Sequence, residues 1–412
     1  MSWWKRLAEN RLLDVVVAVV AGIRLAMIIS VLPGRAITYD FSHYYVASRL
    51  MLEGGNPYCT NLVPLCDKHG FIAVEREMTA PNPPPFQWLF APLAMLPARV
   101  AFWLWVVTEV LSLCVILWLA RRLLGERLSA RGWRFVCAGA VSSAPVFWHF
   151  GFSQVGLLLA ALVLVAYSLH RDGRHAAACL TVSTAGLLKI YPFVLLPWFV
   201  WRSGKDMHSR SKCALLTLGW IILLVLATGT SRWIDFSHCA ALMGEKSLNN
   251  WFNFNVPSFV ANLGYAAYDF APPPSVARFW SAAEPIIALG VIALGYTVCL
   301  RGVGDGEAEF CFLCIVMLAA SVRTWGHYFV FLIFPVTVAA SRVVARPSVN
   351  RAIQLGVILI LLNEMNKWSG PFFDRHVLLQ VVCNDTPLYG LIALGIFFAN
   401  ELRGESSLGK KS

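Results

Sequence analysis

The stretch LLDVVVAVVAGIRLAMIISVL, residues 12–32, decides the class of fold. As an α-helix it would measure about 30 Å, which is the thickness of the hydrocarbon core of a bilayer. Comparable apolar runs recur along the chain of 412 residues, of which 58% are hydrophobic and only 14% are charged. A soluble protein of this length needs more charge to cover its surface. The sequence therefore predicts an all-α integral membrane protein with about 10–12 transmembrane helices.

The first apolar run is too long for the core of a signal peptide and lacks a small-residue cleavage site, so we expect it to be retained. We expect one polytopic domain over residues 1–402, followed by a disordered cytoplasmic tail at 403–412. Further spans are expected near residues 99–120, 133–149, 153–169, 213–229, 279–300, 309–322, 326–341, 351–366 and 386–401.

Basic residues determine the expected orientation. The formal net charge is +11, and the lysines and arginines gather in alternate short loops. This is the positive-inside pattern, which places both termini in the cytoplasm of a multi-pass plasma (inner) membrane protein. The excess charge is expected to meet anionic membrane lipids, and a nucleic-acid partner is not expected. The residues are Arg121, Arg122, Arg127, Arg131 and Arg134; Arg171 and Arg174; Arg202, Lys205, Arg210 and Lys212; Arg342, Arg346 and Arg351; and Arg403, Lys410 and Lys411.

Two long segments, about 33–98 and 230–278, are expected on the outer face. Within the first, PNPPPFQWLFAPLAMLP (81–97) is apolar but interrupted by prolines, which favours a segment at the interface over a span. The stretch 175–201 is ambiguous, because a single span would place the following basic loop outside. Two half-spans broken near LLKIYP (187–192) restore that loop to the inside, so we predict a broken hairpin that lines a polar cavity.

The eleven cysteines are spread along the chain, and none has zinc-ligand spacing. Most lie in apolar runs, where cysteine acts as a small hydrophobe. Cys59 and Cys66 lie in the first outer segment, where a disulfide is plausible in an oxidising compartment, and Cys239 with Cys383 is a second option. The sequence predicts no metal site.

An acid directly follows the first span. Asp40, His43, Tyr44 and Ala47 have the spacing that puts residues on one face of a helix. Aspartate is a preferred N-cap, so Asp40 has a structural explanation. At the membrane rim the same carboxylate could instead take a proton from a hydroxyl nucleophile.

Three cationic or titratable residues are expected on the same outer side. Lys189 lies within the broken hairpin, where an ionisable residue either reaches the interface or faces a cavity or partner. Arg323 and His327 are four residues apart and could project together toward a phosphate, although an arginine at a helix end is often only a flanking charge.

Polar residues elsewhere on the outer side suit sugar recognition, but they equally suit ordinary loops. These are Gln154, Asn253 and Asn255. The chain has no P-loop, no dinucleotide fingerprint and no nucleophilic serine motif, so we expect no bound nucleotide and no cofactor.

The sequence resembles glycosyltransferase family 87, also called DUF2029, whose members are polytopic enzymes of the GT-C architecture. The resemblance rests on YDFSHYYVASRLMLEGGNPY (39–58), on PNPPPFQWLFAPLAMLP (81–97), on GFSQVGLLLAALVLVAYSLHRDGRHAAACLTVSTAGLLKIYPFVLLP (151–197) and on SVRTWGHYFVFLIFP (321–335). The last departs from the family pattern, since Arg-Thr-Trp-Gly stands where a Ser/Pro-rich approach to the His-Tyr pair is expected. The role of Arg323 is therefore less closely tied to the family than that of His327.

The resemblance implies a sugar donor linked to polyprenyl monophosphate, used at the outer membrane face with inversion at the anomeric carbon. Mannose is the family's best-known sugar, and the acceptor would be a glycolipid or a glycan. Asp40 takes the place of the catalytic base, and Lys189, His327 and Arg323 would bind the donor phosphate. His43, Tyr44, Gln154, Tyr191, Asn253 and Asn255 complete the expected substrate site.

Two other classes of protein remain open at this point. A transporter or flippase of lipid-linked sugars would also need a cavity and Lys189, although it would not need two long outer segments. A structural subunit of an envelope-assembly complex, with a decayed site, is the third possibility.

Overall fold

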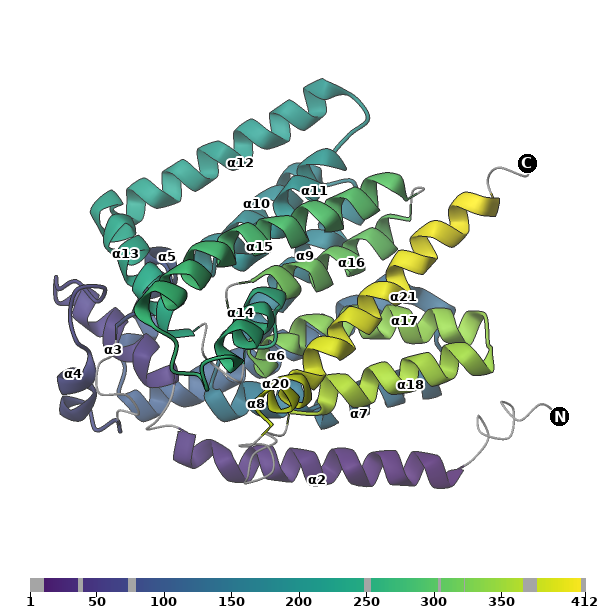
Figure 1. Ribbon diagram of the computed structural model, residues 1–412, viewed down its shortest axis with the longest axis horizontal. Helices are drawn as coiled ribbons and strands as arrows, with labels where there is room; N and C mark the ends of the chain where they lie inside the picture. Colours follow the sequence, from purple (N-terminus) through teal and green to yellow (C-terminus); the bar gives the residue numbers. More distant parts are fainter. Residues whose placement is uncertain are drawn as a thin grey trace.

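The chain forms a bundle of helices, seen here in a computed structural model that describes residues 11–35, 40–72, 79–247, 253–302, 305–321, 323–365 and 376–408. These residues contain α-helices and short 3-10 helices and no strand, which confirms the predicted all-α class. Long helices run side by side, and the first described helix begins at the same end of the bundle at which the last one ends, at the right in Figure 1.

Within the described residues, five helical segments are long and apolar enough to cross a membrane, and the count rises to seven if two bent pairs are each one span. The five are α2 (Arg11–Arg35, continuing toward α3), α6 (Ala98–Leu124), α12 (Met207–Thr228), α15 (Pro274–Arg301), and η3 (Gly326–Leu332) joined to α17 (Ile333–Ala345). The bent pairs are α7 (Ala130–Ser142) with α8 (Ala144–Phe152), at 44°, and α20 (Val377–Asn384) with α21 (Thr386–Leu408), at 51°.

The sequence predicts more apolar segments than this, and the difference is one of length. Several of them are helices too short to count as spans by themselves, including α9 (Gly156–Arg171), α10 (His175–Leu188), η2 (Tyr191–Leu195) with α11 (Leu196–Trp201), and α18 (Val349–Asn363). By contrast α16 (Gly306–Ala320) is buried from Glu307 onward and forms the centre of the bundle. Apolar side chains on α12, α15 and α18 point outward, as expected for helices facing lipid; examples are Leu215, Ile286 and Ile360.

The expected outer segments form helices. These are α3 (Asp40–Leu52), α4 (Val63–Lys68), α5 (Pro84–Ala94), α13 (Thr230–Ser247) and α14 (Val256–Ala266), of which α3, α4 and α13 lie at the left in Figure 1. The proline-interrupted stretch 81–97 contains only α5, of 11 residues, too short for a span.

The stretch 175–201 forms the predicted broken hairpin. Helix α10 begins at His175, whose Nδ1 lies 3.2 Å from Nδ1 of His170 at the end of α9. It ends before Lys189, and η2 and α11 then return to the start, where the Trp198 ring lies 5.1 Å from the His170 ring. Both ends of the hairpin therefore meet at the basic end of the bundle, and Lys189 is carried to its far tip.

Neither of the two disulfides that the sequence leaves open is formed. All eleven cysteines are free; Cys66 is buried, Cys59 is exposed, and the Sγ of Cys239 lies 3.0 Å from Oγ1 of Thr79. Helix α21 extends to Leu408, so the first residues of the expected tail at 403–412 overlap the end of this helix. Residues 409–412, with Lys410 and Lys411, lie outside the described part of the chain, as do residues 248–252 of the second outer segment.

Candidate active site

Six of the predicted site residues line one cavity of about 460 Å³, and four of them lie at helix ends. Asp40 begins α3, Gln154 follows α8, Lys189 follows α10, and Arg323 follows α16. Tyr44 and Tyr191 line the same cavity. Each of the four lies at the end of a helix, where the chain turns and the side chain is free to project. We call this space the Asp40 cavity.

Gln154 holds the carboxylate of Asp40. Its Nε2 donates a hydrogen bond to Oδ2 of Asp40, and its Oε1 accepts one from the Tyr44 hydroxyl at 3.2 Å. Gln154 reaches this position through a tight turn, since Ser153 has a φ of 55° and the Gln154 N–H returns to the His149 carbonyl at 3.2 Å.

Two cations act on the Asp40 carboxylate across the cavity. Burial disfavours the ionised form of Asp40, and the charges of Lys189 and Arg323 partly offset this by favouring it. Lys189 makes no ion pair within the described part of the chain, and its Nζ lies over the Tyr328 ring, 4.4 Å from the centroid. A cation that no protein acid neutralises is available to an anionic ligand.

Several buried polar groups that line the Asp40 cavity have no hydrogen-bond partner among the described residues. They are the side-chain amide of Asn82 and the hydroxyl of Tyr191. Buried polar groups are nearly always paired, so these two side chains indicate a ligand that carries hydroxyl groups, or water in its absence. Asn82 is absent from the sequence prediction, and nothing in PNPPP distinguishes it from a loop asparagine.

Two predicted residues lie outside this cavity and instead brace its wall. Asn255 accepts from the Ser258 N–H at 2.7 Å and so caps α14. Asn253 accepts from the Thr324 N–H at 2.6 Å, which fixes the segment that carries Arg323. These asparagines position the site, and the structure does not place them on the cavity surface.

The predicted histidines also lie elsewhere. His43 is half-buried on α3 and does not line the Asp40 cavity. His327 is 1% exposed and lines a separate, smaller cavity on the other side of Trp325. Neither histidine therefore contacts the space that contains Asp40 and Lys189.

A buried acid-histidine pair, which was not predicted from the sequence, supports the turn that carries Gln154. Glu109 on α6 lies 2.8 Å from Nε2 of His149 on α8, and the same carboxylate accepts from the Leu158 N–H at 3.3 Å. Both side chains are at most 2% exposed. The sequence did contain one signal for this pair, because Glu109 is a single acid inside an apolar span. Placing an acid there costs free energy, so it usually has a specific partner.

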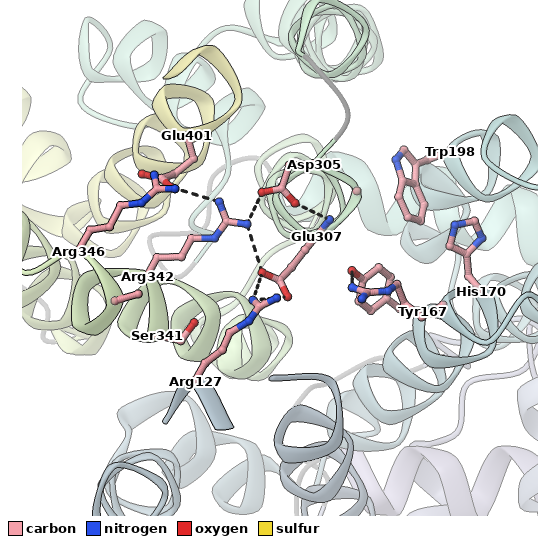
Figure 2. Close-up of a pocket in the computed structure, with 13 residues that line it drawn as sticks. Arg127, Tyr167, His170, Trp198, Asp305, Glu307, Ser341, Arg342, Arg346 and Glu401 are labelled. Atoms are coloured by element: carbon pink, nitrogen blue, oxygen red, sulfur yellow. Dashed lines mark hydrogen bonds and ion pairs between the residues drawn. The ribbon is translucent and has the colours of Figure 1, made fainter. Parts of the chain in front are cut away.

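A second cavity, of about 670 Å³, lies at the basic end of the bundle (Figure 2). Its three acids are all paired with arginines: Arg342 pairs with Asp305, Glu307 and Glu401, and Arg127 donates to Glu307 at 2.7 and 2.9 Å. Burial would raise the pKa of Asp305, but the hydrogen bond and charge of Arg342 lower it below its ordinary value. We call this space the Arg342 cavity.

Within the described residues no group of three or more His, Cys, Asp or Glu side chains lies close enough to hold a metal ion. The Asp40 cavity thus offers one carboxylate, two cations and several unpaired hydrogen-bonding groups. This arrangement suits an anionic ligand joined to a polyol.

The profile of glycosyltransferase family 87 matches residues 81–335. The match covers more than half of the chain, so the chain belongs to glycosyltransferase family 87 and is a membrane glycosyltransferase. The matched range contains Asn82, Gln154, Lys189 and Arg323, whereas Asp40 precedes it. No curated protein matches the chain.

Proposed function

We propose that the protein transfers a sugar, with mannose as the first candidate, from a polyprenyl-monophosphate donor to a hydroxyl of a glycolipid or glycan at the outer membrane face. The observation that carries this proposal is the Asp40 carboxylate, held by Gln154, facing Lys189 and Arg323 across one cavity. A base opposite two cations is what a displacement at a phosphate-bearing anomeric carbon requires.

The proposed reaction is one displacement. Asp40 takes the proton of the acceptor hydroxyl as its oxygen bonds to the anomeric carbon. The bond between that carbon and the phosphate oxygen breaks, and polyprenyl phosphate leaves with the electron pair. The attack comes from the face opposite the leaving group, so the configuration inverts.

Lys189 and Arg323 are proposed to stabilise the charge that gathers on the departing phosphate. Fixed cations in a cavity with little water act strongly on such charge, because the surroundings need not reorganise during the reaction. The Asp40 cavity is otherwise lined mostly by apolar groups, among them Phe193, Val194 and Phe236, which suits a donor carried on a lipid.

The unpaired polar groups suit the sugar. Asn82 and Tyr191 line the cavity with their hydrogen-bonding atoms unused, and Tyr44 lies beside Gln154. A hydrogen-bonding site rejects ligands that lack the matching hydroxyl, because its buried groups would then stay unpaired. These residues are therefore proposed to select the sugar.

Two observations support the outer location. Helix α9 runs from the turn that bears Gln154 to Arg171, and its 16 residues correspond to about 24 Å. The basic residues lie at the far end of that path, and positive charge marks the cytoplasmic side.

The test is a donor panel on purified protein in lipid nanodiscs. Each polyprenyl-phosphate sugar is offered with a host lipid extract, and mass spectrometry detects the glycosylated product. We expect a product with one donor, lost in Asp40→Asn and retained in Asp172→Asn, whose acid pairs with Arg122 on the exposed surface. Movement of lipid-linked sugar across the bilayer without any product would favour the transporter instead.

A further inference from the structure

A small cavity of about 190 Å³ adjoins the Asp40 cavity, and Trp325 lines both. Its wall is formed by Trp148, Phe152, Phe254 and Met365, with Gly326 and His327. At about 30 Å³ for each water it would hold roughly six waters, so it has room for one small ring and not for a chain. We call it the His327 cavity.

His327 is the polar group of this space. Its side chain is 1% exposed, and neither Nδ1 nor Nε2 has a hydrogen-bond partner among the described residues. Nε1 of Trp325 is buried and unpaired as well. A buried imidazole with both nitrogens unused is unfavourable unless a ligand or ordered water satisfies it. The cavity therefore offers hydrogen bonds that the protein itself does not use.

The aromatic rings give the cavity its second property. The His327 ring lies 5.5 Å from the Phe152 ring and 5.6 Å from the Trp325 ring, and Trp148 stacks on Phe152 with centroids 5.4 Å apart. The electron-rich faces of such rings attract the weakly positive C–H groups on the flat side of a sugar ring. Aromatic faces beside unpaired nitrogens suit a molecule with both C–H faces and hydroxyl edges.

Other ligands fit less well. No lysine, arginine or acid is among the described residues that line the His327 cavity, so a phosphate would be buried without a counter-charge. An isoprenoid end would fill the space but would leave the nitrogens of His327 and Trp325 unpaired. A neutral polyol satisfies both the rings and the nitrogens.

A glycine helps to shape the cavity. A Cβ at Gly326 would lie 2.9 Å from Cε of Met365 and 3.5 Å from Cε2 of Phe254, closer to the methionine than a side chain allows. Because Gly326 has no Cβ, Met365 and Phe254 can pack against the backbone beside His327 and form part of the cavity wall.

We propose that the His327 cavity binds one neutral monosaccharide ring through the two nitrogens of His327 and the surrounding aromatic faces. This inference rests on the proposed glycosyl transfer, because it supplies a subsite for a sugar of the donor or of the acceptor. It also assigns His327 to a sugar ring in place of the donor phosphate.

The first test measures binding, independently of transfer. Full-length protein in nanodiscs is titrated with methyl α-D-mannopyranoside and methyl α-D-glucopyranoside, with inorganic phosphate as a comparison, and saturation-transfer NMR reports contact with the ring protons. We expect binding of at least one glycoside, weakened tenfold or more in His327→Phe and less in His327→Gln, which keeps one donor and one acceptor. Phe310→Leu, in the aromatic cluster around Tyr167 outside both cavities, should bind as the wild type does.

Binding that is unchanged in a folded His327→Phe protein would overturn the proposal, as would phosphate competing at His327 when no glycoside does. The second test separates the two sources of the ring: a raised KM for the acceptor or for the donor in His327→Gln shows which sugar occupies the cavity. If the wild type transfers sugar and both KM values stay unchanged, the His327 subsite fails while the transferase stands. If the wild type binds glycoside through His327 but transfers none, the proposed function fails instead.

Discussion

The Asp40 cavity and the Arg342 cavity contain similar residue types but use them differently. In the Arg342 cavity the carboxylates of Asp305, Glu307 and Glu401 are all paired with arginines (Figure 2). In the Asp40 cavity the carboxylate is held by an amide, and Lys189 is left without an ion pair among the described residues. Paired charges stabilise the fold, whereas charges kept apart are available to a ligand. Volume alone would favour the Arg342 cavity, the larger of these two.

Removing the carboxylate of Asp40 should have the largest effect and tests the proposed difference between the two cavities most directly. Asp40→Asn should lower sugar transfer about 10²–10⁴-fold, because the amide cannot accept the acceptor's proton. Transfer is measured by mass spectrometry in nanodiscs, and thermal unfolding should stay close to wild type. A folded variant that keeps a tenth or more of the activity would rule out Asp40 as the base.

Removing the charge of Lys189 should have the next largest effect. Lys189→Gln is expected to lower kcat and kcat/KM together by about 10²–10³-fold, since the charge acts on the departing phosphate in the transition state. Steady-state kinetics with the donor varied measure this loss. The matched control is Lys205→Gln, an exposed lysine in a basic loop, which should leave both constants unchanged. An increase confined to KM would show that Lys189 only binds the donor.

A substitution in the Arg342 cavity should change the stability of the fold and leave the kinetic constants unchanged. Glu307→Gln removes the carboxylate shared by Arg127 and Arg342 and should destabilise the fold by about 1–3 kcal/mol. The melting temperature, followed by tryptophan fluorescence, should fall while the KM values remain. Glu126→Gln, an exposed acid nearby, serves as the control. Lost transfer with an unchanged melting temperature would instead give this cavity a part in the reaction.

Two tyrosines, one with an unpaired hydroxyl and one with a paired hydroxyl, allow a smaller version of the same comparison. Tyr191→Phe deletes a hydroxyl that has no protein partner, so we expect stability to hold while KM rises by up to about tenfold. Tyr296→Phe deletes a hydroxyl that donates to the Val194 carbonyl at 2.6 Å, so stability should fall while KM holds. Kinetics and thermal unfolding of both variants decide the matter, and the reverse pattern would contradict the assignment of Tyr191 to the ligand.

Much of the site could be predicted because ionisable residues in an apolar chain are conspicuous. Lys189 stands alone in its hairpin, and Asp40 directly follows the first span, so the cost of placing charge in or near lipid marks both. Asn82 gave no such signal, since an asparagine that faces a ligand looks the same in sequence as one that caps a turn. For that reason Asn253 and Asn255 were expected on the cavity, whereas they brace the segment beside it.

The sequence by itself determined the class of fold, the basic end of the bundle and the break in the hairpin at Lys189, because hydropathy and charge act locally along a chain. Only the tertiary structure decided which helix ends meet. It brought Asp40, Gln154, Lys189 and Arg323 to one cavity, paired Glu109 with His149, and placed His327 behind Trp325. These contacts depend on where the short helices turn back within the bundle. Packing between segments that are distant in the sequence determines the positions of those turns.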